Sequence, residues 1–138
     1  IKRKQFGKPI IKFQGISFLL AEMAARAESA KLLTRHAAWQ ADNKIPNSYN
    51  SAIAKWKASE WAMQSMVDAI QVFGGFGYAE EYGLGVLFRG AKLLEIYEGT
   101  NQVQRIVIAN ALKKQAQKSN SGFKLDYEGV DAPDPWED

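Results

Sequence analysis

A single carboxylate stands between two expected helices, in the stretch Ile96-Tyr97-Glu98-Gly99-Thr100. Glu98 directly precedes a glycine and Thr100, a residue type that often caps helices. A glutamate at such a junction can be held rigidly and still point into a cleft, which suits a base that removes a proton from carbon. An acid near a helix N-terminus that only interacts with the helix dipole is the alternative. From these residues alone, both interpretations of Glu98 stay open.

A glycine cluster offers a second candidate site. Gly74-Gly75 and Gly77 follow Gln71 at the end of an expected helix. No strand precedes the cluster, so it is neither a Walker loop nor a dinucleotide-fold fingerprint. A helix C-cap followed by a tight turn explains the same glycines. Glycine also lets a ligand approach the backbone closely, and Gln71 would lie beside that opening.

The composition excludes several other kinds of site. The chain has no cysteine, which excludes disulfides, thiol catalysis and cysteine-based metal sites. His36 is the single histidine and has no glutamate three residues before it, so the Glu-x-x-His pairs of a di-metal bundle are absent and we expect no metal. A net charge of +3 is too small to indicate nucleic acid. No apolar run approaches the roughly 18 residues of a membrane span, and no signal peptide is visible.

Charge is distributed unevenly between the two ends of the chain. Residues 1–12 carry five basic residues and no acid, whereas residues 120–138 carry six acids and only Lys124. The basic start could contact phosphates on a ligand, or it could be a solvated arm. The chain begins with Ile1 rather than methionine, so we expect a fragment or a processed product. We expect a helical domain over residues 1–118 and an acidic tail over 119–138.

Hydrophobic periodicity predicts the elements that must position these residues. Helices are expected over about 14–41, 47–73, 84–94 and 101–116, with a break at Pro46. On each of three helices, one set of residues is expected to share a face. These sets are Ile16, Leu20, Met23, Ala27 and Ala30 on the first, Ile53, Trp56, Met63, Val67 and Ile70 on the second, and Val103, Ile106, Val107 and Asn110 on the last. Asn101 and Gln104 fit a capping box. We predict an all-α fold, an up-and-down bundle of four main helices, without strands of useful length.

Several motifs, in order, resemble the C-terminal helical domain of acyl-CoA dehydrogenases. Each motif alone is weak, but together they cover residues 1 to about 114 at the family's spacing. They are Arg3-Lys4-Gln5-Phe6-Gly7-Lys8-Pro9-Ile10 with Phe13-Gln14, Ala21-Glu22-Met23-Ala24, Ala37-Ala38-Trp39, Gln71-Val72-Phe73-Gly74-Gly75 with Gly77-Tyr78, and Ile96-Tyr97-Glu98-Gly99-Thr100 with Gln102 and Gln104-Arg105. Two positions depart from the family: Gly83 replaces a common proline and Gly90 a common acid, which is expected to loosen the turn around residues 81–91.

The resemblance implies an enzyme that oxidises acyl-CoA to trans-2-enoyl-CoA with FAD. Glu98 would remove the α-proton, with Tyr97 and Gly99 beside the substrate. Thr100 and Gln102 would contact the nearer flavin, and the FAD of a neighbouring subunit would be contacted by Arg3, Phe6, Gln71, Gly74 and Gly75. It further implies a homo-oligomer, dimer or tetramer, with electron-transfer flavoprotein as electron acceptor, in bacterial cytoplasm or the mitochondrial matrix.

The family's N-terminal helical domain and middle β domain are missing from this sequence, and they supply much of the pocket. We therefore expect the chain alone to be inactive. A non-catalytic helical oligomerisation module and a fragment of an acyl-CoA oxidase are the alternatives.

Overall fold

The computed structural model describes residues 3–118, so the acidic tail predicted for residues 119–138 lies outside the described residues. The chain opens with a small hairpin of β1 (Lys4–Gln5) and β2 (Lys8–Pro9), in which Lys4 pairs with Pro9 and Gln5 with Lys8. Phe6 and Gly7 form its two-residue turn, both with positive φ, as the twist of tight hairpins requires. Strands of two residues are too short to show alternation, which is why the sequence did not predict them.

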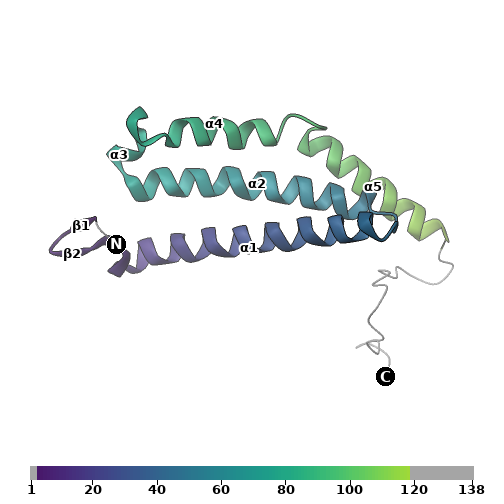
Figure 1. Ribbon diagram of the computed structural model, residues 1–138, viewed down its shortest axis with the longest axis horizontal. Coiled ribbons are helices and arrows are strands. Elements are labelled where there is room, and N and C mark those ends of the chain that lie inside the picture. Colours follow the sequence, from purple (N-terminus) through teal and green to yellow (C-terminus); the bar gives the residue numbers. More distant parts are fainter. Residues whose placement is uncertain (1–2, 119–138) are drawn as a thin grey trace, which may run out of the picture.

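A long antiparallel helical hairpin forms the body of the molecule (Figure 1). After a short 3-10 turn, η1 (Ile10–Lys12), α1 runs over Gln14–Asp42 and α2 over Ser48–Phe73, which confirms both predicted helices. Most of the predicted stripe on α1 faces α2, although Ala27 is exposed and Arg26 lies on the inner face instead. The Arg26 guanidinium pairs across the hairpin with the Asp68 carboxylate.

The chain then returns along α2 through shorter elements. These are α3 (Gly75–Tyr78), η2 (Glu80–Tyr82), α4 (Leu84–Leu94) and α5 (Asn101–Lys118). Gly83 adopts φ of +69°, a conformation closed to the proline that the family often has there. Gly90 lies within an unbroken α4, so the expected loosening is not seen at that position.

Helix α2 is the centre of the fold. α1 covers one side of it, and α4 and α5 follow one another along the other side (Figure 1). The four main helices confirm the predicted all-α class. Among residues 3–118, none of the helices combines the length and apolar character that a membrane crossing demands.

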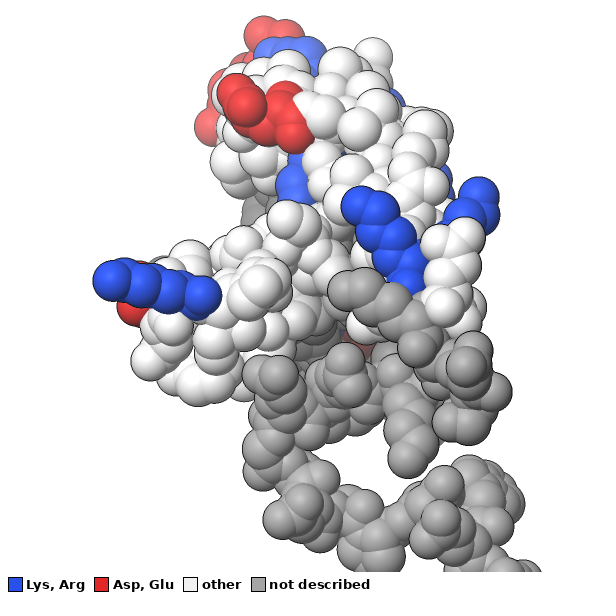
Figure 2. Space-filling view, turned by 90° about the vertical axis from the view of Figure 1, so that its right-hand side faces the viewer, with Lys and Arg blue, Asp and Glu red and all other residues white. Residues whose placement is uncertain are grey.

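The apolar core of the described part is thin. Its buried apolar side chains are mostly small: Ala37, Ala52, Ala54, Leu84 and Ala91. Large apolar side chains lie on the surface of every main helix, and the predicted stripe on α5 is partly wrong, because Val103, Ile106 and Asn110 are exposed while Val107 faces inward. Figure 2 shows one end of the molecule, where Lys and Arg are scattered among uncharged residues. Exposed apolar surface on this scale is typical of faces that other protein parts cover.

Candidate functional site

The loop that carries Glu98 joins α4 to α5 and is closed on itself. The Asn101 N–H donates to the Glu95 carbonyl at 3.0 Å, which brings the two ends of the loop together. Two consecutive residues inside it, Glu98 and Gly99, have positive φ of 54° and 85°. A left-handed backbone is unusual for glutamate and costs of the order of 1–3 kcal/mol, so it persists only where the surroundings impose it.

Gln104 is one of the residues that impose this shape. Its side-chain amide donates to the backbone carbonyls of Glu98 at 3.3 Å and Gly99 at 3.2 Å. A Cβ added to Gly99 would lie 2.8 Å from the same amide nitrogen and would displace it, and the φ of +85° favours glycine at this position. The Glu98 side chain is exposed and no hydrogen bond to its carboxylate is found within residues 3–118. The arrangement is a rigid backbone that holds out a carboxylate able to accept a proton.

The sequence offered two caps for α5, Thr100 and a capping box of Asn101 with Gln104, and the structure shows the first. Thr100 Oγ1 accepts from the Val103 N–H at 3.3 Å, so Thr100 caps the helix and the Asn101–Gln104 capping box was wrong. The reason is competition for the Asn101 side chain, which turns toward α2 instead. There its Oδ1 accepts hydrogen bonds from Lys55 Nζ at 3.1 Å and from Ser59 Oγ at 2.9 Å.

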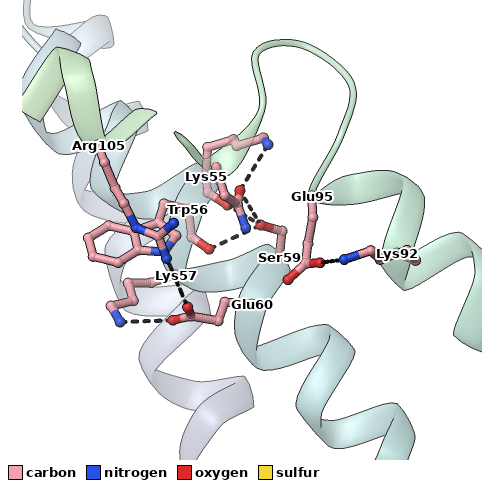
Figure 3. A network of polar contacts seen from close by, with 9 residues as sticks. Lys55, Trp56, Lys57, Ser59, Glu60, Lys92, Glu95 and Arg105 are labelled. Carbon is pink, nitrogen blue, oxygen red and sulfur yellow. Dashed lines mark hydrogen bonds and ion pairs between the residues drawn. The ribbon is translucent and has the colours of Figure 1, made fainter. Parts of the chain in front are cut away.

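A polar hollow of about 220 Å³ lies beside this loop. Two predicted residues, Thr100 and Gln102, line it together with Glu60, Lys92, Glu95, Ile96, Asn101 and Arg105. Lys92 pairs with Glu95 at 2.6 Å, and Arg105 reaches Glu60 at 3.3 Å (Figure 3). The hollow therefore combines backbone and side-chain donors at the start of an 18-residue helix with two cations. Both cations are already paired with the carboxylates of Glu95 and Glu60, so the donors at the start of α5 are the groups here that suit an anionic ligand.

Glu60 organises the cations at the edge of the hollow. The hydrogen bond from Lys57 is the main cause that lowers the pKa of Glu60, helped by the charges of Lys57 and Arg105 and by Trp56, against the opposing effect of burial. The Arg105 guanidinium lies against the Trp56 ring (Figure 3), 4.5 Å from the ring centre. Glu60 is thus anionic near neutral pH and ties α5 to α2.

The other predicted residues gather at the far end of α2. Gly74 ends that helix with φ of +62° and donates its N–H to the Ile70 carbonyl at 3.0 Å. A Cβ on Gly75 would meet open space, so the backbone there is accessible. The Arg3 guanidinium lies 4.7 Å from the centre of the Phe76 ring, next to this turn. The hairpin at the chain start and the glycine turn thus form one cluster, with Gln71 exposed beside it.

An apolar hollow of about 700 Å³ adjoins the glycine turn. Among the described residues Arg3 is the one charged residue of its lining, and the others are Ile10, Ile11, Ile16, Leu20, Val72, Phe73, Phe76 and Tyr82. Phe6 lies in the hairpin turn with its side chain 91% exposed, in edge-to-face contact with Phe13 at 6.1 Å.

The structure therefore divides the predicted residues into two clusters. Residues 97–102 lie near Ser59 of α2, whereas Arg3, Gln71, Gly74 and Gly75 lie near its C-terminal end. Fifteen residues separate Ser59 from Gly74, which is roughly 22 Å along a helix at about 1.5 Å per residue. The sequence did not predict the contacts of Lys55, Ser59 and Glu60 with α5. The one available signal was the polar Ser59 at helical spacing from Ala52 and Trp56.

Comparison with known proteins identifies the family of this fold. The family described as "Acyl-CoA dehydrogenase, C-terminal domain" matches residues 1–113. The short-chain-specific acyl-CoA dehydrogenase of Megasphaera elsdenii is 48% identical over 111 residues, which are 80% of this chain and 29% of that relative. The Caffeyl-CoA reductase-Etf complex subunit CarC of Acetobacterium woodii is 44% identical over 114 residues, 83% of this chain and 30% of that protein.

Solved structures give the same result. Butyryl-CoA dehydrogenase from Megasphaera elsdenii superposes with a TM-score of 0.80 at 47% identity, over 81% of this chain and 29% of that one. The prolyl acyl carrier protein oxidase AnaB superposes with a TM-score of 0.78 at 37% identity, over 80% and 29%. The chain thus spans less than a third of the length of these relatives.

Proposed function

This chain belongs to the acyl-CoA dehydrogenase family, and from that premise we propose that it forms the C-terminal helical part of an FAD-dependent enzyme that oxidises acyl-CoA thioesters to trans-2-enoyl-CoA. The observation that carries the proposal is the Glu98 loop, whose backbone is locked while its carboxylate is held out from the surface. The name of the 48% identical relative, a short-chain-specific acyl-CoA dehydrogenase, supports the substrate class.

Glu98 is the proposed base. Its carboxylate takes the α-proton of the thioester, and Tyr97 and Gly99 line the substrate side of the loop. FAD, when bound, supplies the acceptor for the β-hydrogen, which leaves as hydride. A carboxylate becomes a stronger base when it is removed from water. Glu98 is exposed in the described part of the chain, so other parts of the enzyme must cover it. For this reason we propose that the chain alone has no dehydrogenase activity.

The donors at the start of α5 and the charge of Arg3 suit the phosphate-bearing parts of FAD, while Glu60 and Glu95 balance the two cations of the polar hollow. At the polar hollow, Thr100 and Gln102 offer donors at a helix start, close to Arg105. At the far end, Arg3 supplies a charge beside the open backbone of Gly74 and Gly75. We propose these residues, with Gln71 and Phe6, as FAD contacts. The clusters lie roughly 22 Å apart along α2, and the family resemblance assigns them to the flavins of two subunits.

The partners follow from this assignment. A flavin shared between subunits requires a homo-oligomer, a dimer or a tetramer, and the exposed apolar faces of the helices supply surface for it. Electron-transfer flavoprotein is the proposed electron acceptor, supported by the name of the Etf-complex relative. Bacterial cytoplasm or the mitochondrial matrix is the proposed compartment.

A fused enzyme tests the role of Glu98. In it, this chain replaces the matching C-terminal part of the Megasphaera elsdenii relative, and Glu98→Gln is compared with the unchanged fusion. General-base catalysis contributes roughly 10²–10⁴-fold, so turnover should fall by that factor while the flavin absorbance of the purified enzyme is retained. Glu28→Gln, at an exposed ion pair on α1, controls for loss of a carboxylate. Unchanged turnover in Glu98→Gln would refute the proposed base.

An oxidase is the second candidate, because the prolyl acyl carrier protein oxidase shares the fold at 37% identity. The higher identity to dehydrogenases favours the first proposal. Oxygen consumption with peroxide release during turnover, in the absence of any other acceptor, would support the oxidase. A fused enzyme that assembles but neither retains flavin nor turns over would support a purely structural, oligomerising role.

A further inference from the structure

Two buried polar side chains meet between α2 and α5. Within residues 3–117, Ser59 and Asn101 are the polar residues classed as buried, with exposed fractions of 4% and 5%. The Ser59 hydroxyl lies 2.9 Å from Asn101 Oδ1, and Lys55 adds a donor to the same oxygen at 3.1 Å. The single Ser59 proton also has the carbonyls of Lys55 and Trp56 on its own helix within reach, at 2.9 and 3.0 Å. The Asn101 oxygen is paired through α2, and buried polar groups are costly unless paired, so this contact stabilises one specific arrangement of the two helices.

Asn101 also belongs to the Glu98 loop. Its backbone N–H closes the loop on the Glu95 carbonyl, and its side chain is anchored on α2. Glu98 lies three residues earlier, and the carbonyls of Glu98 and Gly99 are held by Gln104, one turn further along α5. Hydrogen bonds of the loop and of α5 thus connect α2 to the backbone that carries the Glu98 side chain.

The other contacts between α2 and α5 only weakly specify the register of one helix against the other. Much of the α5 surface is exposed or half-buried, and the buried residues of α2 other than Ser59 are the small Ala52 and Ala54. The second polar link, from Arg105 to Glu60, is longer, at 3.3 Å, and lies between partly exposed side chains. A buried polar contact is the best attested means of selecting one register among similar apolar packings.

We infer that Asn101, held by Ser59, is a positioning residue that sets the register of α5 on α2 and thereby the direction of the Glu98 carboxylate. The inference rests on the proposed function for its catalytic consequence. Asn101 does not touch the reacting atoms; it acts through the loop. A displacement of about 1 Å at a reacting group costs roughly 10²-fold in rate, so the loss of this anchor should be seen mainly in kcat.

Four variants of the fused enzyme test the inference. Asn101→Leu and the double variant Ser59→Ala/Asn101→Leu remove the polar pair, whereas Asn101→Asp keeps an acceptor for Ser59 and Lys55. Asn110→Leu makes the same change at an exposed position of α5. The readouts are kcat, KM, the melting temperature, and hydrogen exchange of peptides covering residues 95–104.

We expect kcat to fall roughly 10²-fold in Asn101→Leu, with little change in KM and with faster exchange in the loop. Asn101→Asp should restore both readouts, and Asn110→Leu should change neither. Replacing both partners with apolar groups is often nearly neutral for stability, so the double variant should recover its melting temperature while kcat stays low.

A double variant with normal melting temperature, normal kcat and unchanged exchange would overturn the inference. Recovery of kcat together with stability would also overturn it, because the role would then be structural only. The exchange readout does not depend on catalysis. If Glu98→Gln leaves turnover unchanged while loop exchange still rises in Asn101→Leu, the proposed function fails and the anchoring of the loop stands.

Discussion

At the scale of single residues, the backbone conformation of Glu98 is the most informative observation. Only three non-glycine residues in the described part of the chain have positive φ: Phe6, Lys44 and Glu98. Two of these three are candidate site residues. Strained residues persist where the surroundings impose them, and they concentrate at functional sites. At Glu98 the imposing groups are Gln104 and the closed loop, which supports a constrained role for the carboxylate.

A substitution at Gly99 tests how strictly the backbone conformation of the Glu98 loop is maintained. Gly99→Ala would place a Cβ 2.8 Å from the Gln104 amide, at a φ of +85° that alanine avoids. We expect a loss of stability of about 1–3 kcal/mol and a loss of turnover in the fused enzyme, measured by urea unfolding and initial rates. Gly90→Ala is the control, because that helical glycine has open space and alanine should stabilise it by up to about 1 kcal/mol. Equal stability of the two variants would contradict the prediction.

Glu60 makes a pH-dependent contribution to the stability of the fold. Because its folded-state pKa is lowered from the ordinary value of 4.5, Glu60 stabilises the fold above that value and loses this contribution as pH falls through the folded-state pKa. Because the Glu60 side chain is partly exposed, Glu60→Gln should lower the free energy of unfolding by no more than about 1 kcal/mol at pH 7. The difference from the unchanged protein should shrink below pH 4.5, measured by urea midpoints across pH. A difference that stays constant with pH would exclude this role.

At the scale of elements, the return of α3 onto α2 depends on one glycine. A Cβ on Gly77 would lie 2.6 Å from the Ile70 carbonyl oxygen, so only glycine permits this close approach. The approach shapes the turn at Gly74 and Gly75, which meets the hairpin at the chain start through Arg3 and Phe76. Arg3 and the glycine turn, which lie about 70 positions apart in the sequence, are thereby brought together at one candidate ligand site.

Gly77 and Gly75 should respond differently to the same substitution. Gly77→Ala overpacks the junction and should destabilise by about 1–3 kcal/mol. Gly75→Ala meets open space, so its stability should stay close to that of the unchanged protein. If Gly75 contacts FAD as proposed, its affinity for FAD should nevertheless fall. Unfolding curves and FAD titrations of the apo fused enzyme distinguish the two effects. Unaltered FAD affinity in Gly75→Ala would argue against that contact.

At the scale of the whole molecule, the bundle leaves large apolar side chains uncovered. Phe18, Leu32, Trp39, Val86 and Ile106 are each more than half exposed, while the buried apolar core consists mainly of alanines. This balance is unusual for an independent domain and typical of a part that packs against other surfaces. It agrees with a chain that spans less than a third of the length of its relatives.

The isolated 138-residue chain should therefore be a poor enzyme. We expect no reduction of a dye acceptor with an acyl-CoA substrate, because nothing in its described part covers Glu98. The fused enzyme, assayed at the same concentration, provides the positive control. Turnover by the isolated chain above the rate without protein would show that residues 1–138 suffice for catalysis.

Much of the secondary structure could be predicted from the sequence. The limits of α1, α2 and α4 follow from helical periodicity, Pro46 and the glycines, which act within a few residues. The order of the motifs was enough to indicate the family that the comparisons then showed. The hairpin at Lys4–Pro9 could not be predicted because strands of two residues show no periodicity. The inner face of α5 could not be predicted because apolar residues occur on all sides of that helix.

The sequence by itself determined the helices, the position of Glu98 at a helix junction and the family, because each depends on local spacing or on motifs in order. Only the tertiary structure decided that Thr100 rather than Asn101 caps α5. The contacts of Asn101 with Ser59 and Lys55, which lie 42 and 46 residues away along the chain, are likewise visible only in the tertiary structure. The physical reason is that a buried polar side chain must find a partner, and the available partner depends on how distant helices pack.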